Sequence, residues 1–178
     1  MMLREWDGGD ADLSRAADLY AEVFSEPPYG DDPATSRESF IERATRYART
    51  KPAFRLLLAE DDDLMVGLVL GIGTDHGDWW RDRVAEAVDA ETRRSWLAAE
   101  CFFVNELAVS QPYRRQGVAA RLMEQVLAAL PYDTALLTCY AEADATRRFY
   151  AAQGWSEIVC GFRVGSSPEL CLLARRTP

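Results

Sequence analysis

The sequence predicts a mixed α/β domain built around one sheet, from its size, its order of helical and strand patterns, and its lack of repeats. A chain of 178 residues with 48% hydrophobic and 28% charged residues has the size and composition of one globular domain. No repeat, low-complexity tract or linker divides it, so we expect a single domain over residues 1–178. The expected order of elements is β-α-α-β-β-(insert)-β-α-β-α-β-β.

The first half of the chain contains helical spacing, a hairpin pattern and an insert. The expected elements are a strand at 3–6, a helix at 13–24, a second helix starting at 35, hairpin strands at 54–60 and 64–72, and two helices within an insert at 74–99. Pro27 and Pro28 end the first helix. Thr35 to Glu38 has the form of a capping box, which predicts the start of the second helix there.

The second half predicts the remaining strands of the same sheet. The expected elements are a strand at 101–109, a helix at 118–130, a strand at 134–140, a short helix at 144–153, and strands at 157–164 and 169–174. Asp144 is expected to cap the short helix, and Gly154 to end it in the left-handed conformation.

The composition excludes several classes of function. A net charge of −9 argues against a nucleic-acid partner, because phosphate binding needs a basic face. No run approaches the roughly 20 apolar residues needed to span a bilayer, and the N-terminus lacks the layout of a secretory signal. We therefore expect a cytoplasmic protein that binds neither membrane nor nucleic acid.

The cysteines and the single histidine give no catalytic or metal-binding pattern. The four cysteines (Cys101, Cys139, Cys160 and Cys171) are scattered without a C-x-x-C pair, so we expect reduced core residues and no metal. His76 lies in a turn rich in glycine and aspartate, which makes a histidine-based nucleophilic device improbable.

One segment, residues 105–119, carries the strongest chemical signal. A buried strand ends there, a turn with Arg114, Arg115 and Gly117 follows, and an amphipathic helix begins at once. The first-turn N–H groups of that helix have no intrahelical partner, and the helix dipole adds partial positive charge, which suits a pyrophosphate. Gly117 would let the phosphate approach the backbone, and either arginine could add a charged contact. A plain loop with solvated arginines is the alternative.

Two motifs resemble the GNAT superfamily of CoA-dependent N-acetyltransferases. Arg114-Arg115-Gln116-Gly117-Val118-Ala119 resembles its Q/R-x-x-G-x-G/A loop, and Phe149 to Trp155 resembles its F/L-Y-x-x-x-G-F/W signature. The resemblance implies a mixed central sheet splayed at strand four, flanking helices and, here, a helical insertion before strand four. It also implies acetyl-CoA as cosubstrate, bound by the main chain of Leu107, Ala108 and Val109 and by the loop from Arg114 through Arg115, Gln116, Gly117 and Val118 to Ala119.

The resemblance implies catalytic roles for two residues. Tyr150 matches the tyrosine that protonates the departing thiolate, although it could also be a core residue. Glu106 interrupts an apolar strand, where a charge is costly without a purpose. It could be the general base, bind the substrate ammonium, or be structural. The sequence departs from the family pattern at Phe103, where some members have their glutamate, and at Ala143, where many have a CoA-binding asparagine.

The acceptor is expected to be a primary amine, preferably of a small molecule. Tyr29, Trp79 and Trp80 are candidate walls of an amine pocket, since aromatic rings bind cations, although tryptophans more often seal a core or a dimer contact. A protein or peptide acceptor and a non-catalytic CoA-binding module are the alternatives. A homodimer is possible.

Overall fold

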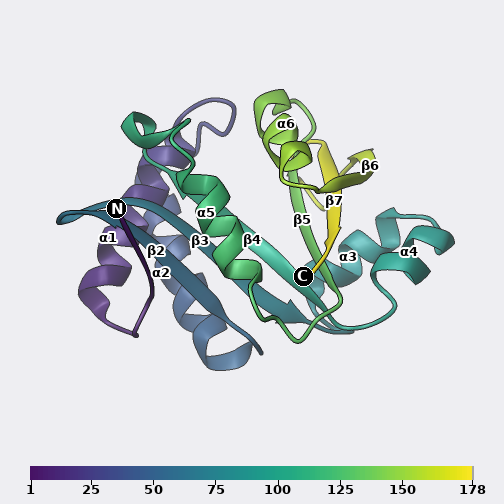
Figure 1. Cartoon of the computed structure of the whole chain (residues 1–178). Coiled ribbons are helices and arrows are strands. Elements are labelled where there is room, and N and C mark those ends of the chain that lie inside the picture. Colours follow the sequence, from purple (N-terminus) through teal and green to yellow (C-terminus); the bar gives the residue numbers. More distant parts are fainter. Residues whose placement is uncertain (178) are drawn as a thin grey trace. The chain divides into compact units, whose positions relative to one another are not determined.

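The computed structural model describes residues 1–177 (Figure 1), which form a mixed α/β fold. In chain order the elements are β1 (Met2–Glu5), α1 (Asp10–Ser25), α2 (Pro33–Thr50), β2 (Arg55–Asp61), β3 (Leu64–Thr74), α3 (Trp79–Ala87), α4 (Ala90–Trp96), β4 (Cys101–Val109), a 3-10 turn (Gln111–Tyr113), α5 (Val118–Leu127), β5 (Thr134–Tyr140), α6 (Asp144–Ala152), β6 (Ser156–Phe162) and β7 (Leu170–Arg176). The strand order is β1-β2-β3-β4-β5-β7-β6.

The strand pairing confirms the predicted mixed sheet, with a parallel strand pair at strand four. β4 and β5 pair in parallel, whereas β1–β2, β2–β3, β5–β7 and β6–β7 pair antiparallel. The recorded parallel ladder joins only Phe102 and Phe103 to Ala135 and Leu136, while β4 continues to Val109. A short parallel ladder of this kind is what a sheet splayed at strand four requires.

The chain forms two compact units, and β4 contributes to both. The first contains Met1–Ile72 and Asn105–Ala128, and the second contains Gly73–Val104 and the chain from Ala129 onward. A single domain over the whole chain therefore stays a prediction.

In the first unit, α1 and α2 pack together through an aromatic cluster. Tyr20 of α1 stacks on Phe40 of α2 at 4.8 Å between ring centroids and on Phe24 at 4.3 Å. Phe40 and Ala44 are fully buried, as is Ala17 of α1. These residues recur at helical spacing, so the apolar stripes visible in the sequence are the faces that meet.

Helix α5 lies close to the strands because β3 has a glycine at the contact. A Cβ on Gly67 would approach Val118 Cγ1 and Leu122 Cδ1 to 3.0 Å each, and the Ala108 carbonyl oxygen to 3.4 Å. Both helix side chains are buried. Gly67 therefore fixes how closely the helix that follows the predicted anion loop can approach its strands.

Three predicted helix boundaries in the first unit are wrong. Helix α1 begins at Asp10, three residues before the predicted start at residue 13. The second helix starts at Pro33 rather than at the Thr35 capping box, because the Asp32 carboxylate accepts from Thr35 N at 2.9 Å and acts as the N-cap. Helix α5 ends at Leu127 and not at residue 130. There Arg55 Nη1 donates to the carbonyls of Val126 and Ala128, at 3.1 and 2.6 Å, and so satisfies the helix end.

The second unit contains the insert and the C-terminal strands, and one predicted helix cap there is wrong. Arg81 of α3 is buried and donates from Nη2 to the carbonyls of Leu97 and Ala99, which ties the two predicted insert helices together. Asp144 lies in the first turn of α6 and not at its N-cap, which is Ala143 and has no side-chain cap. Gly154 is left-handed, with φ +79, as predicted.

The expectation that all four cysteines are reduced is wrong for one pair. Cys160 and Cys171 form a disulfide, because β6 and β7 place them directly opposite each other with a Cα–Cα distance of 4.0 Å. Cys101 and Cys139 are free and buried, as expected.

No helix within residues 1–177 has both the length and the apolar character needed to cross a membrane.

We expect Gly67→Val to destabilise the chain by about 1–3 kcal/mol, because the added methyl groups would overpack the contact with Val118 and Leu122. Urea denaturation followed by circular dichroism measures the change. Leu64→Val is the matched control, since Leu64 lies on the same strand with 62% of its surface exposed. Equal midpoints for the two variants would contradict the close helix approach.

Candidate active site

The segment after β4 forms a tight loop that leads directly into α5. Ser110 N donates to Val66 O at 3.0 Å as the strand ends, and the 3-10 turn follows. Arg115 has φ +64, and Gly117 has φ +81 and ψ 0 as the residue preceding the helix. The left-handed conformation at Gly117 is accessible to glycine at little cost, which explains the residue type at this point of the loop.

The N-terminus of α5 has no side-chain cap. Gly117 has no side chain that could accept from the first turn, and this N-cap has no side-chain cap hydrogen bond. The space where a Gly117 Cβ would lie is open, because among the described residues only the chain neighbours of Gly117 have atoms within 4 Å. The first-turn N–H groups of this ten-residue helix therefore face an open position with the positive end of the helix dipole behind them. Such a position suits a phosphate group.

The loop is braced by its own side chains. Arg114 donates from Nε to Val109 O at 3.0 Å and forms an ion pair from Nη1 to Glu26 of the α1 end at 2.6 Å. Gln116 Nε2 donates to Pro112 O at 2.7 Å. The guanidinium of Arg114 is thus committed to holding the loop, whereas Arg115 is exposed. Of the two arginines, Arg115 has the freer side chain for a charged ligand.

The residues predicted to bind through the strand edge lie in the last part of β4. Leu107 is half-buried, and Ala108 and Val109 are buried. Their side chains are therefore largely occupied in packing, which leaves main-chain groups as the ligand-binding atoms. The Val109 carbonyl already accepts from Arg114.

Glu106 is held in a buried cluster of α1, α2 and β4. Arg43 Nη2 lies 2.8 Å from Glu106 Oε1 and 3.2 Å from the Tyr20 hydroxyl. The Arg43 guanidinium also lies 5.6 Å from the centroid of the Tyr20 ring. The side chains of Arg43 and Glu106 are 22% and 12% exposed, so water screens this pair only partly.

The cluster perturbs the acidity of its members. Burial raises the pKa of the Glu106 carboxyl, against the opposing effects of the Arg43 charge and a hydrogen bond from Tyr20, and Asp31 raises it further. Burial, together with the charge of Glu106, raises the pKa of Tyr20. A carboxylate with a raised pKa is a stronger proton acceptor, which suits a general base.

Arg43 and Tyr20 were missed by the reasoning from sequence. Both lie on helix faces among apolar residues, where helical spacing indicates packing rather than chemistry. The signal that could have found Arg43 is Glu106 itself, because a carboxylate in an apolar strand needs a buried cation. Arg43 Nε and Asn105 Oδ1 are buried without a hydrogen-bond partner in the part of the chain described.

Tyr150 lies in the second unit, on α6. It is 7% exposed, and its ring lies 5.2 Å from that of Phe149 and 6.0 Å from that of Trp155, edge to face with the latter. The Tyr150 carbonyl accepts from Trp155 N at 3.1 Å, so the turn that contains Gly154 folds back on the helix. This packing limits the directions in which the phenol can point.

The three aromatic residues predicted to line an acceptor pocket belong to different units. Tyr29 lies in the first unit, in the turn between α1 and α2, with its ring 4.6 Å from Phe24. Trp79 and Trp80 begin α3 in the second unit, with ring centroids 5.9 Å apart. Trp79 is 63% exposed, which is unusual for so large an apolar residue. Their role toward an acceptor stays a prediction.

Comparison with known proteins identifies the family. The acetyltransferase (GNAT) family profile matches residues 16–155, so the chain belongs to this family of acetyltransferases. No curated protein sequence matches the chain.

Solved structures share the fold at low sequence identity. One solved structure, named histone acetyltransferase HPA2 and related acetyltransferase, comes from Corynebacterium glutamicum ATCC 13032. It is 17% identical in sequence to this chain, with a TM-score of 0.70, and the match covers 100% of this chain and 98% of that one. Arabidopsis thaliana NAA60 in complex with acetyl-CoA is 14% identical with TM-score 0.67 and coverages of 98% and 97%. The ribosomal-protein-S18-alanine N-acetyltransferase from Escherichia coli is 14% identical with TM-score 0.62 and coverages of 99% and 94%.

We expect Arg43→Met to raise the pKa of Glu106 further, because Arg43 provides the charge that opposes the effect of burial. When the pKa of a carboxyl is higher in the folded state than in the unfolded state, the free energy of unfolding of the protein falls as pH rises through the folded-state pKa. The variant should therefore be destabilised more at pH 7 than at pH 4, by about 2 kcal/mol. Denaturant unfolding across this pH range measures it.

The matched control is the double variant Arg43→Met/Glu106→Gln, which has no carboxyl to ionise at this position and should lose the added pH dependence. A pH dependence that persists in the double variant would assign it to another group.

Proposed function

We propose that this chain is an N-acetyltransferase that moves the acetyl group of acetyl-CoA to a primary amine, most suitably of a small molecule, by direct transfer in a ternary complex. The observation that carries the proposal is the uncapped N-terminus of α5 behind the left-handed Gly117, within a chain of the GNAT family. That loop supplies backbone donors and a helix dipole at one point, as a pyrophosphate needs.

Acetyl-CoA binding is assigned to the loop and to the strand before it. The N–H groups of residues 115–119 would hold the pyrophosphate, with Arg115 adding charge and Arg114 keeping the loop in shape through Glu26 and Val109. The main chain of residues 107–109 would pair with the pantetheine arm. Arabidopsis thaliana NAA60, which shares the fold, was solved in complex with acetyl-CoA.

Glu106 is proposed as the general base. It takes a proton from the substrate ammonium, and the neutral amine attacks the thioester carbonyl carbon. Its raised pKa favours proton transfer to the carboxylate, and Arg43 keeps it sufficiently ionised to act.

Tyr150 is proposed as the general acid. When the tetrahedral intermediate collapses, the carbon–sulfur bond breaks, and the phenol donates its proton to the departing thiolate. The nitrogen releases its second proton to solvent, and the phenolate takes a proton back from solvent. A phenol is a suitable donor because its ordinary pKa, about 10, lies near that of a thiol. Packing against Phe149 and Trp155 limits the directions in which this phenol can point.

A cationic small molecule is the favoured acceptor. The chain has a net charge of −9, and Asp31, at the turn before α2, acts electrostatically on both Glu106 and Tyr20. A negative field at this place favours an ammonium group over an anionic acceptor. Tyr29, Trp79 and Trp80 are the proposed aromatic contacts, and a homodimer and a cytoplasmic location remain part of the proposal.

A peptide or protein amine is the second candidate. It is favoured by the fold shared with the ribosomal-protein-S18-alanine N-acetyltransferase from Escherichia coli. Parallel assays with a polyamine and amino-sugar panel and with short peptides of varied N-terminal residue distinguish the two acceptor classes. Tight acetyl-CoA binding without thiol release on either panel would instead favour a non-catalytic CoA-binding module.

We expect Gly117→Asp to weaken acetyl-CoA binding by at least about tenfold, because it places a carboxylate where the phosphate would lie. Calorimetric titration measures the affinity. Gly165→Asp is the matched control, since Gly165 is also left-handed, with φ +59 and open space around it. Equal affinities in the two variants, or no binding heat with the unmodified chain, would reject the loop as the CoA site.

We expect Glu106→Gln to reduce kcat/KM at neutral pH by about 10²–10⁴-fold, with acetyl-CoA affinity retained, because glutamine cannot accept the proton. In the unmodified chain the rate should rise with pH through a value above the ordinary glutamate pKa of about 4.3, since only the carboxylate is active. Thiol release with the best amine measures both. A variant with a nearly intact rate at high pH would assign the base to another carboxylate acting through water.

A further inference from the structure

A row of sulfur and carboxylate groups crosses the C-terminal strands β5, β7 and β6. In antiparallel strands, directly opposed residues project from the same face. Cys171 of β7 lies directly opposite Cys160 of β6 and also directly opposite Cys139 of β5. The three cysteines therefore form one row across three adjacent strands.

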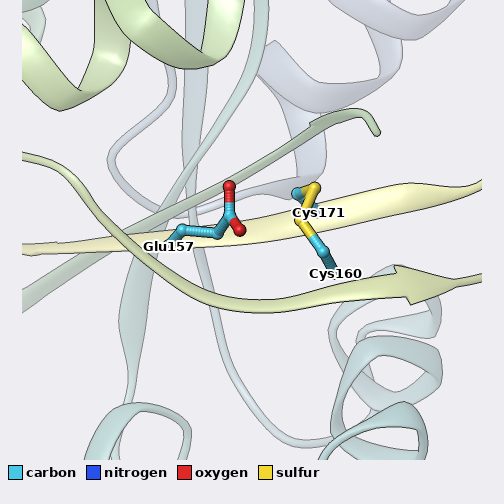
Figure 2. A group of neighbouring side chains, drawn as sticks. All are labelled: Glu157, Cys160 and Cys171. Atoms are coloured by element: carbon cyan, nitrogen blue, oxygen red, sulfur yellow. A yellow bond between two sulfur atoms is a disulfide. The ribbon is translucent and has the colours of Figure 1, made fainter. Parts of the chain in front are cut away.

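A β-bulge brings Glu157 into the same group. Residues three apart on a regular strand point to opposite faces. In β6, however, Glu157 opposes Leu173 while Val159 opposes Leu172, so Ile158 is an extra residue. This insertion turns Glu157 to the face of Cys160. Figure 2 shows the three side chains of Glu157, Cys160 and Cys171 on neighbouring strands, and one carboxylate oxygen and the two sulfurs lie within 4.8 Å of one another.

Glu157 is held in place from outside this group. Arg147 of α6 contacts Glu157 Oε2 from Nε at 2.9 Å and from Nη2 at 2.8 Å, and its Nη1 donates to Ala141 O at 3.0 Å. Both contacts with Glu157 use Oε2, so Oε1 is not engaged by Arg147. A ligating carboxylate with one oxygen fixed by an outer partner is the usual arrangement around protein metal ions.

We propose that Glu157, Cys160 and Cys171 form a zinc site when the disulfide is reduced, with water as the fourth ligand. Two thiolates and a carboxylate are a donor set that Zn²⁺ accepts in tetrahedral geometry. Thiolate sulfurs lie about 2.3 Å from zinc, so two of them at tetrahedral angles are roughly 3.8 Å apart. Reduction lets the sulfurs separate toward this spacing, and the carboxylate oxygen, at most 4.8 Å away, needs only a small approach.

Exchange of the disulfide for zinc takes two steps, reduction of the sulfur–sulfur bond and then loss of two thiol protons to solvent. A dithiol reductant gives two hydrogen atoms to the Cys160–Cys171 bond, which yields two thiols and the oxidised reductant. Zinc then displaces one proton from each thiol and binds the two thiolates. Both states join β6 to β7 at the same two residues, so the hairpin is closed by a covalent bond or by a metal ion.

Exposure and position distinguish the ligands from the neighbouring thiol. Glu157 and Cys160 are exposed, which provides a path for the ion, while Cys171 is buried. Cys139 is a buried free thiol of β5 and does not belong to the group whose ligand atoms lie within 4.8 Å of one another. Cys101 is a second buried thiol, located on β4 and hydrogen-bonded to Thr74.

The test is a zinc titration of the full chain after reduction by a dithiol and its removal without oxygen, in competition with a chromophoric chelator. We expect one zinc per chain, lost on reoxidation and weakened at least about tenfold in Cys160→Ser and in Glu157→Gln. Cys101→Ser is the matched control and should bind as the unmodified chain does. Co²⁺ in place of zinc should give the near-ultraviolet charge-transfer band of thiolate ligation, absent in Cys160→Ser.

Equal zinc binding by reduced unmodified chain and Cys160→Ser, or a cobalt complex without the thiolate band, would overturn the proposal and leave the disulfide as a structural link. Cys160 is exposed on the edge strand, so its serine variant is expected to fold, and circular dichroism checks this. None of these readouts depends on acetyl transfer, so the site can fail or hold independently of the proposed function.

Discussion

The need to neutralise a carboxylate inside the first unit governs much of that unit's arrangement. Glu106 interrupts an apolar strand, and Arg43 of α2 meets it at 2.8 Å while Tyr20 of α1 contacts the same guanidinium. A buried pair of this kind contributes little net stability, but it is strongly unfavourable when one partner is removed. It therefore fixes the register of both helices against β4. The stacking of Tyr20 on Phe40 supplies the apolar contact that keeps the arginine in place.

In the loop after β4, polar side chains also fix the backbone, and they leave the amide groups of the first turn of α5 available. Arg114 is engaged by Val109 O and Glu26, Gln116 by Pro112 O, and the first turn of α5 has no side-chain cap. A site organised before its ligand arrives loses less entropy on binding. Gly67 sets the distance of α5 from its strands, so the position of the proposed pyrophosphate site depends on a residue outside the loop.

The second unit shows that the same residues can serve packing and chemistry. The edge strand β6 needs a device against slippage and edge pairing, and the Cys160–Cys171 link with a neighbouring bulge provides one. The bulge also aligns Glu157 with the two sulfurs. Arg147 of α6 forms an ion pair with Glu157 of β6. The position of the Glu157 carboxylate therefore depends on where α6 lies as well as on the strand register.

The sequence by itself determined the fold class, nearly every element, the loop at 114–119 and the family, because apolar periodicity, turn residues and motif spacing are local properties. Helix ends were less determined, since Asp32 and Thr35 are rival N-caps within one short segment, and Arg55 satisfies the end of α5 from a distant strand. Only the tertiary structure decided the partner of Glu106, the engagement of Arg114 and the pairing of Cys160 with Cys171. Glu106 with Arg43 and Arg114 with Glu26 join residues far apart in the chain, whereas Cys160 and Cys171, 11 residues apart, meet through the register of two strands. Such pairings are set by strand register and helix packing rather than by any single segment.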